Sequence, residues 1–344
     1  MSDAATLIVG PSWVGDMVMA QSLFKYLRET DPERPLDVLA PGWSLPIVSR
    51  MPEVRCGIAA ETAHGEVSLA TRRRIGLELR GNYDRAIVLP RSLKSALVPW
   101  FAKVSRRTGY RGEMRYGLLN DMRPFDKAAL DQTVKRFLAL GTEPGERLPD
   151  IPFPTLEVSA DNQRIVTRKL GCPTDQPVVA LMPGAEYGPA KCWPLEHFAE
   201  LARLLRREGY FIWILGSAKD RAAGEAIANA TPARSGILNL CGRTSLEDVI
   251  DLLAMTEQVV SNDSGLMHIA AAVGTRVHAI YGSSTPDFTP PLTAKKDIHY
   301  LRLDCSPCFA RECPLGHLNC LRNLAVAGVF AAVLKHRVAW PTER

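Results

Sequence analysis

The sequence predicts an α/β protein of two Rossmann-like domains that face each other across a central cleft. Three observations predict this fold: strand-like and helix-like segments alternate, the length of 344 residues suits two domains, and a proline-rich stretch divides the chain. That stretch, residues 143–158, reads EPGERLPDIPFPTLEV, and proline interrupts regular structure. We therefore expect one domain over residues 1–155, a second over residues 156–323, and a final helix within residues 324–344.

Hydrophobic periodicity predicts the individual elements. Short apolar runs predict buried strands at residues 5–9, 36–40, 85–89, 178–182, 211–215, 258–261 and 277–280. Longer periodic stretches predict helices at residues 17–27, 92–101, 130–140, 195–208, 220–230, 246–255 and 265–273. Because strands that alternate with helices form parallel sheets, ligands are expected beyond the carboxyl ends of the strands.

Composition and charge narrow the class of protein. The N-terminus, MSDAATLIVG, lacks the regions of a signal peptide, and the most apolar stretch, residues 324–334, is shorter than the ~20 residues that span a bilayer. Eight cysteines in such a chain argue against a disulfide scaffold. We expect a cytoplasmic protein, either free or peripheral on the inner face of a membrane.

Positive charge is concentrated in one segment. Residues 70–123 hold 13 Lys and Arg against 4 Asp and Glu, although the whole chain carries a net charge of only +5. Such an excess suits an anionic partner, and a solvated basic face is the alternative.

The first turn, from Gly10 to Met17, reads GPSWVGDM. Its glycines have P-loop spacing, but Asp16 and Met17 stand where a P-loop needs Lys and Ser or Thr, so a nucleoside triphosphatase is excluded. Neither GxGxxG after the first strand nor Tyr-x-x-x-Lys is present, which argues against an oxidoreductase or a sugar epimerase. Asp16 can serve as a general base on a sugar hydroxyl, or it can simply favour the first turn of its helix.

Three loops at strand ends in the second half predict a nucleotide site. The segment SNDSGLMH, residues 261–268, opens a helix whose first N–H groups suit a diphosphate. Residues 182–194 form a Gly- and Pro-rich loop with Lys191, and residues 215–220 form a turn of small residues. The alternative is a capped structural helix with a packed His268.

Eight segments resemble one family, the lipopolysaccharide inner-core heptosyltransferases, and within it the heptosyltransferase II group. They are GPSWVGDMVMAQSL, SRMPEV, LPRSLKSALVP, RTGYRGEMRYGLLND, PGAEYGPAKCWP, GSAKD, SNDSGLMHIAA and YGSSTPDFTPPL, in order over residues 5 to 292. The resemblance implies the GT-B fold and inverting, metal-independent transfer of L-glycero-D-manno-heptose from ADP-heptose onto the first heptose of the inner core. Heptosyltransferases I and III, and a non-catalytic nucleotide-binding module, are the alternatives.

Site residues follow from the resemblance by position. It implies Asp16 as the catalytic base. It implies donor contacts at Glu186, Lys191, Thr244, Asp263, Gly265, Leu266 and His268. The acceptor would be an anionic Kdo-lipid A-heptose at the membrane surface, and the basic segment offers it Arg91, Ser92, Lys94, Arg107, Arg111 and Arg115. No nucleic acid is expected as a partner, and the GT-B fold implies that the helix at residues 324–337 packs back on the N-terminal domain.

Four cysteines gather near the end of the chain, at positions 305, 308, 313 and 320, with His317 among them. Cys305, Cys308, Cys313 and Cys320 could hold a structural zinc ion, although only the first pair has the CxxC spacing of a zinc knuckle. A reduced, loop-packed cluster and a disulfide are the alternatives. No cofactor is expected for catalysis.

Overall fold

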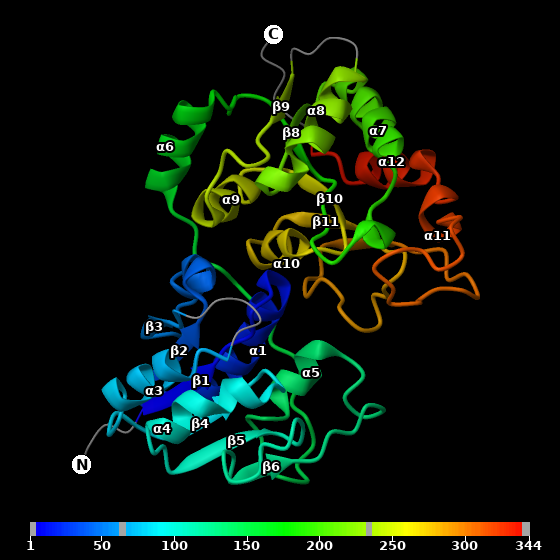
Figure 1. Ribbon diagram of the computed structural model, residues 1–344. Coiled ribbons are helices and arrows are strands. Elements are labelled where there is room, and N and C mark those ends of the chain that lie inside the picture. The colour runs from blue at the N-terminus through cyan, green and yellow to red at the C-terminus, as the bar shows by residue number, and fades with distance from the viewer. Residues whose placement is uncertain (1–4, 62–66, 232–235, 339–344) are drawn as a thin grey trace. The chain divides into compact units, whose positions relative to one another are not determined.

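The computed structural model describes residues 5–61, 67–231 and 236–338, and the chain divides into two compact units, Met1–Thr155 and Leu156–Arg344 (Figure 1). Each unit is an α/β layer structure built around a parallel sheet, as the alternation of strands and helices predicts.

The first unit holds six parallel strands in the order β3-β2-β1-β4-β5-β6. The strands are β1 Ala5–Val9, β2 Leu36–Ala40, β3 Cys56–Ala59, β4 Tyr83–Val88, β5 Arg106–Tyr110 and β6 Asp121–Arg123. Every residue of β1 and β2 is buried, because helices cover both faces of the central strands. The strand order reverses between β1 and β4, which is the point where ligands bind in open sheets of this kind.

The second unit repeats this topology. Its strands are β7 Val178–Met182, β8 Phe211–Ile214, β9 Ile237–Asn239, β10 Gln258–Asn262, β11 Arg276–Ile280 and β12 Lys296–His299. They are all parallel in the order β12-β11-β10-β7-β8-β9, which is the order of the first sheet when it is counted from β7. The reversal here lies between β7 and β10, and the two loops that follow these strands are residues 183–194 and 263–264.

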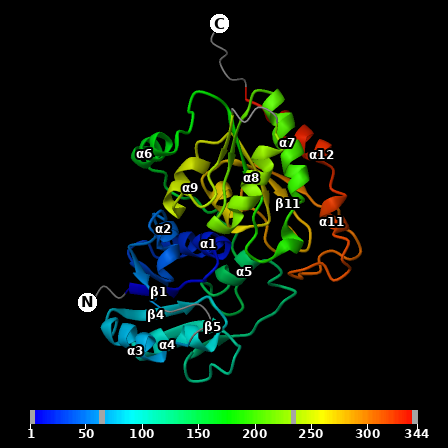
Figure 2. The same cartoon turned by 45° about the horizontal axis from the view of Figure 1, so that its top comes forward.

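Helices join the strands in both units (Figure 2). In the first unit they are α1 Val14–Thr30, α2 Leu45–Val48, α3 Leu69–Glu78, α4 Leu97–Phe101 and α5 Thr133–Leu138. In the second they are α6 Ala160–Leu170, α7 Leu195–Arg207, α8 Arg221–Asn229, α9 Leu246–Leu253, α10 Gly265–Ala272, α11 Asn319–Arg322 and α12 Val326–Lys335. Short 3-10 turns occur at Gly42–Ser44, Leu93–Ala96, Pro189–Lys191 and Ala218–Asp220.

The last helix, α12, forms within residues 324–344, where the sequence predicts one. Helix α12 packs on α7 and β11 of the second unit, and Figures 1 and 2 both show it beside α7. Val326, Val329 and Val333 lie on one face of α12 and are buried in the core that surrounds the second sheet. This apolar stripe packs the helix against the core of its own unit, and the expected packing on the N-terminal domain stays a prediction.

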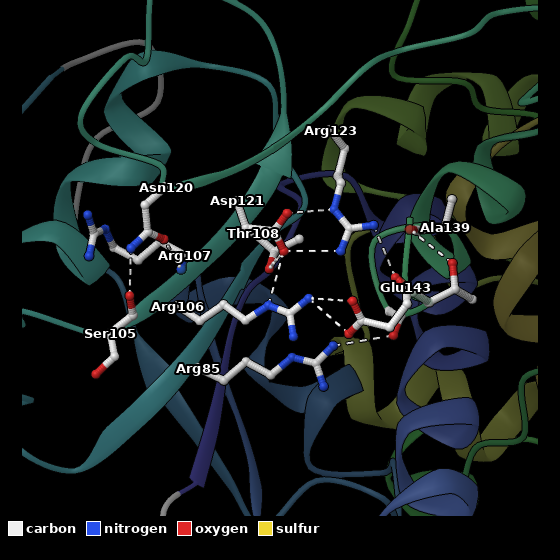
Figure 3. A network of polar contacts seen from close by, with 12 residues as sticks. Arg85, Ser105, Arg106, Arg107, Thr108, Asn120, Asp121, Arg123, Ala139 and Glu143 are labelled. Atoms are coloured by element: carbon white, nitrogen blue, oxygen red, sulfur yellow. Dashed lines mark hydrogen bonds and ion pairs between the residues drawn. The ribbon is translucent and has the colours of Figure 1, made fainter. Parts of the chain in front are cut away.

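An ionic network closes the outer edge of the first sheet (Figure 3). Asp121 on β6 accepts hydrogen bonds from Arg123 Nε at 2.7 Å, Thr108 Oγ1 at 2.9 Å and Arg106 Nε at 3.1 Å. Arg106 continues to Glu143 at 2.9 Å. Burial alone would raise the pKa of Asp121, but the hydrogen bonds from Arg123, Thr108 and Arg106 lower it to about 2.

Asp121→Asn is expected to lower the free energy of unfolding by about 2–3 kcal/mol, because it removes the charged acceptor of two arginines. The side chain of Arg123 is only 9% exposed, so water replaces its partner poorly. Urea denaturation of both proteins measures the effect. Asp131→Asn is the matched control: Asp131 pairs with Lys135 on the surface, and its loss should cost less than about 0.5 kcal/mol. Equal effects of the two substitutions would contradict the structural role of the network.

Candidate functional site

Asp16 lies at the switch point of the first sheet. It occupies the first turn of α1, immediately after β1 and the loop at residues 10–13, and it is half-buried. An ideal Cβ built on Gly10 would stand 2.7 Å from Met17 Cε, so this turn brings the helix onto the strand end as closely as a glycine allows.

Basic and aromatic side chains surround this part of the first unit. The Arg91 guanidinium lies 4.2 Å from the centre of the Phe125 ring, and the Arg136 guanidinium lies 5.0 Å from the same centre. Burial lowers the pKa of Arg136, while the charge of Asp16 acts in the opposite direction, which places Asp16 within electrostatic reach of Arg136. The structure thus brings the predicted base and one predicted acceptor residue, Arg91, into one neighbourhood.

Three other residues predicted to bind the acceptor are at least partly exposed. Arg111 is exposed, and its Nε donates to the Tyr116 hydroxyl at 3.2 Å. Ser92 and Lys94 are half-buried, and Ser92 Oγ donates to Ser95 Oγ at 3.2 Å. These residues, with Arg91, remain accessible to a ligand.

Arg107 and Arg115 are exceptions to the predicted acceptor set. Arg115 is fully buried, at 0% exposure, and its guanidinium donates to the carbonyl oxygens of Pro90 at 2.8 Å and of Tyr110. Arg107 donates to the carbonyl oxygens of Leu118 and Val104. Burial lowers the pKa of both arginines. Both guanidinium groups donate to backbone carbonyl oxygens. The complete burial of Arg115 argues against direct contact with the acceptor, whereas Arg107 is half-buried and its contact with the acceptor stays a prediction.

The predicted donor residues in the second unit form a compact polar cluster. Lys191 Nζ lies 2.5 Å from Asp263 Oδ2, and the hydroxyl of Ser284 donates to the same oxygen at 2.6 Å. The side chains of Lys191 and Asp263 are 18% and 5% exposed. Lys191 also lies 5.2 Å from the centre of the Tyr187 ring. Asp263 therefore holds the ammonium group of Lys191 at the carboxyl ends of strands β7 and β10.

The N-terminus of α10 borders this cluster. Ser264, Gly265 and Leu266 are half-buried, and the Ser264 side chain accepts no hydrogen bond from the first turn. The first-turn N–H groups at the positive end of the helix dipole are a ready site for a phosphate. Asn262 holds the adjacent loop in place: its amide group accepts from Trp193 N at 3.0 Å and donates to the Pro183 carbonyl at 2.6 Å.

The remaining predicted donor residues lie on neighbouring loops. Glu186 is exposed and pairs with Lys219 at 3.0 Å. Lys219 lies in the turn at residues 215–220, so this turn carries a cation that is paired to Glu186. The hydroxyl of Thr244 is buried and has no hydrogen-bond partner among the described residues. These positions are compatible with an adenosine pocket.

His268 is buried, at 4% exposure, and burial lowers its pKa to about 4. The folded protein therefore binds fewer protons than the unfolded chain between pH 4 and pH 6.5, and stability from this group is complete above pH 6.5 and is lost as the pH falls toward 4. We expect acidification from pH 7 to pH 5 to remove about 2 kcal/mol through His268. Urea denaturation at both pH values should show a correspondingly smaller loss in His268→Gln. An unchanged loss in the variant would show that other groups cause it.

Three of the four clustered cysteines, Cys305, Cys308 and Cys313, lie in the loop between β12 and α11, and Cys320 lies in α11. All eight cysteines are free thiols, and among the described residues no group of three or more His, Cys, Asp or Glu side chains stands ready to hold a metal ion. In addition, no helix in residues 5–61, 67–231 and 236–338 is both long and apolar enough to cross a membrane.

Two parallel sheets of this order, with a helix N-terminus and a lysine at the switch point of the second, are the architecture of glycosyltransferases of the GT-B type. The profile of glycosyltransferase family 9 (heptosyltransferase) matches residues 72–319. The chain belongs to this family, and the predicted resemblance is confirmed.

Individual relatives agree with the family. The chain is 47% identical over 298 residues to lipopolysaccharide heptosyltransferase 2 of Salmonella typhimurium, covering 84% of this chain and 86% of the relative. It is 46% identical over 302 residues to lipooligosaccharide heptosyltransferase 2 of Haemophilus influenzae, covering 85% and 87%. The structure of Escherichia coli ADP-heptose heptosyltransferase II superposes with a TM-score of 0.87 at 41% identity, covering 96% of this chain and 98% of the other.

Sequence reasoning missed several residues of both sites. Ser284 lies in the segment YGSSTPDFTPPL, which contributes to the resemblance without a role for any single residue. Phe125 and Arg136 lie outside every quoted segment, and no pattern in the sequence marks them. Only the fold brings them toward Arg91 and Asp16.

Proposed function

We propose that this glycosyltransferase moves L-glycero-D-manno-heptose from ADP-heptose onto the first heptose of the lipopolysaccharide inner core, with inversion at the anomeric carbon. The observation that carries the proposal is the polar cluster of Lys191 and Asp263 beside the N-terminus of α10, in a chain 47% identical to a heptosyltransferase 2. A cation and a helix N-terminus together suit a diphosphate leaving group.

The donor is held by the second unit. Lys191 and the first-turn N–H groups at Gly265 and Leu266 bind the diphosphate and stabilise the negative charge that builds up as the sugar leaves. Asp263 keeps Lys191 in position through their 2.5 Å contact. His268 is neutral at pH 7, because burial lowers its pKa to about 4, so it adds no charge. Glu186 and Thr244 line the adenosine side.

Asp16 is the base in the first unit. Its carboxylate accepts the proton of the acceptor hydroxyl as that oxygen forms a bond to the anomeric carbon, and the bond from this carbon to the diphosphate oxygen breaks. The proton thus passes to Asp16 and the electron pair leaves with ADP. No metal ion takes part in this scheme.

The acceptor, a Kdo-lipid A-heptose with phosphate and carboxylate groups, meets the accessible residues Arg91, Ser92, Lys94 and Arg111. Arginine suits both anions because its planar fork donates two parallel hydrogen bonds. Such a lipid acceptor lies at a membrane surface, and we propose that the protein works in the cytoplasm on the inner face of the membrane.

A transfer assay with two acceptors tests this function. Purified protein is given ADP-heptose with an acceptor that ends in one heptose, or with one that ends in Kdo, and ADP release and the mass of the product are measured. We expect one heptose to be added to the first acceptor only. Transfer to the Kdo-terminated acceptor would indicate the preceding step of the pathway. Binding of ADP without any transfer would indicate a non-catalytic module.

A further inference from the structure

Four cysteine side chains surround one small cavity in the second unit. Cys305, Cys308, Cys313 and Cys320 all line a cavity of about 20 Å³, which His317 also borders. This volume accommodates a single atom or ion and is far too small for a nucleotide or a sugar. Cys305 and Cys308 are exposed, Cys313 is half-buried and Cys320 is buried, so the cavity opens toward solvent on one side.

The chain turns back on itself after Cys313. Gly316 has a φ of +72°, and its N–H group donates to the Cys313 carbonyl oxygen at 3.1 Å. This turn brings Cys313 and Cys320 to the same cavity as Cys305 and Cys308.

The cysteine loop is bonded to the proposed donor site. Ala190 N, next to Lys191, donates to the Arg311 carbonyl at 3.0 Å, and the Tyr187 hydroxyl donates to the Phe309 carbonyl at 2.7 Å. Phe309 N donates to the Ser283 carbonyl at 2.7 Å. Gly188 fits tightly against this loop, since an ideal Cβ on it would stand 2.5 Å from the Arg311 oxygen. Whatever orders the cysteine loop therefore also orders the backbone that carries Lys191.

We propose that Cys305, Cys308, Cys313 and Cys320 bind one Zn²⁺ ion as a structural tetrathiolate site. Four soft sulfur ligands in tetrahedral array are the preferred closed site of zinc. Each thiol gives up its proton to solvent, so that Zn²⁺ and four thiols become a tetrathiolate complex and four protons, without oxidation or reduction.

Binding requires side chains to rotate. The sulfur atoms do not yet stand in ligating positions, because the described residues contain no ready metal group. Cys305 and Cys308 are exposed, so rotation about their Cα–Cβ bonds toward the shared cavity meets little packing. The ion would replace a void with bonds and tie both ends of the loop at residues 305–320 together.

Metal analysis of the untagged full-length protein tests the site. After growth in zinc-supplemented medium and dialysis against a weak chelator, elemental analysis should find about one zinc per chain. Cys308→Ser should reduce zinc content at least about tenfold, whereas Cys308→His, which supplies another zinc ligand, should retain it. Cys56→Ser is the matched control, because Cys56 is an exposed free thiol in the first unit, and it should leave zinc content unchanged.

Cobalt substitution gives a second, independent readout. The cobalt form of the wild type should show the intense visible bands of a tetrahedral thiolate complex, and Cys308→Ser should lose them. Wild-type protein without metal, equal zinc content in wild type and Cys308→Ser, or a disulfide among these cysteines in the freshly purified protein would overturn the proposal. Iron in place of zinc would overturn the choice of ion. Heptosyl transfer is not part of this test, so its outcome is separate from that of the proposed function.

Discussion

Asp16→Asn is expected to lower kcat about 10²–10⁴-fold, because the amide cannot accept the proton of the attacking hydroxyl. The substitution keeps the size and shape of the side chain at its half-buried position in the first turn of α1. Donor binding should be unchanged, since the proposed diphosphate site belongs to the second unit. Single-turnover transfer measures the chemical step, and calorimetric titration with ADP measures donor binding.

The stability of the Asp16→Asn variant distinguishes a catalytic role of Asp16 from a merely structural one. If Asp16 only favoured the start of α1, its loss would cost about 0.3–1 kcal/mol of stability and little activity. Asp31→Asn at the other end of the same helix is the matched control and should retain normal turnover. Near-normal turnover in Asp16→Asn would remove the base from the mechanism.

Lys191→Met is expected to lower kcat/KM for ADP-heptose about 10²–10³-fold, because it removes a preorganised positive charge from the leaving diphosphate. Methionine keeps most of the length of the lysine side chain, whose Nζ lies 5.2 Å from the centre of the Tyr187 ring. The loss should appear both as weaker ADP binding and as a lower kcat, since charge on the diphosphate grows during the reaction. Steady-state kinetics with varied donor, together with ADP titration, measures both parts.

Two further variants test whether the lower kcat/KM of Lys191→Met comes from lost stability or from changed net charge. Lys191→Met leaves the 5% exposed Asp263 without its cation, so the double variant Lys191→Met/Asp263→Asn should regain stability but not activity. Lys169→Met removes an exposed lysine of the same unit, in the last turn of α6, and should change kcat/KM less than about threefold. A comparable loss in Lys169→Met would argue that net charge alone accounts for the effect.

The central strands of both sheets could be predicted from the sequence because they are continuous apolar runs. Each predicted strand matches one of β1, β2, β4, β7, β8, β10 and β11 to within about two residues at each end. Strands at the sheet edges, and β5 next to one of them, escaped prediction. The edge strand β12 reads KDIH, and β5, which pairs with β4 and the edge strand β6, reads RRTGY, so both lack a continuous apolar run. Pairing with a neighbouring strand, not side-chain pattern, makes them strands.

The helices were predicted less accurately than the central strands. Helix α3, LATRRRIGLE, buries only Arg72, Ile75 and Gly76, and α6 is mostly polar, so neither shows a clear apolar stripe. The stretch at residues 130–140 forms a helix only over Thr133–Leu138.

Sequence patterns also predict the candidate site only in part. Motif position indicated Lys191, Asp263 and Gly265, and the fold brings them together at one sheet edge. Arg115 was misjudged because a basic segment does not reveal which of its arginines turns inward. Three backbone carbonyl oxygens accept hydrogen bonds from its guanidinium, and no pattern of residue types along the chain encodes that arrangement.

The close contact between Gly188 and Arg311 limits which amino acids position 188 can hold. Gly188 has a φ of +154°, and its Cα hydrogen faces the carbonyl oxygen of Arg311, so even a methyl group would drive the two backbones apart. A natural or engineered change there would loosen the loop that carries Lys191 without altering Lys191 itself. Substitutions in nearby loops that are meant to broaden sugar specificity should therefore leave the contact between Gly188 and Arg311 unchanged.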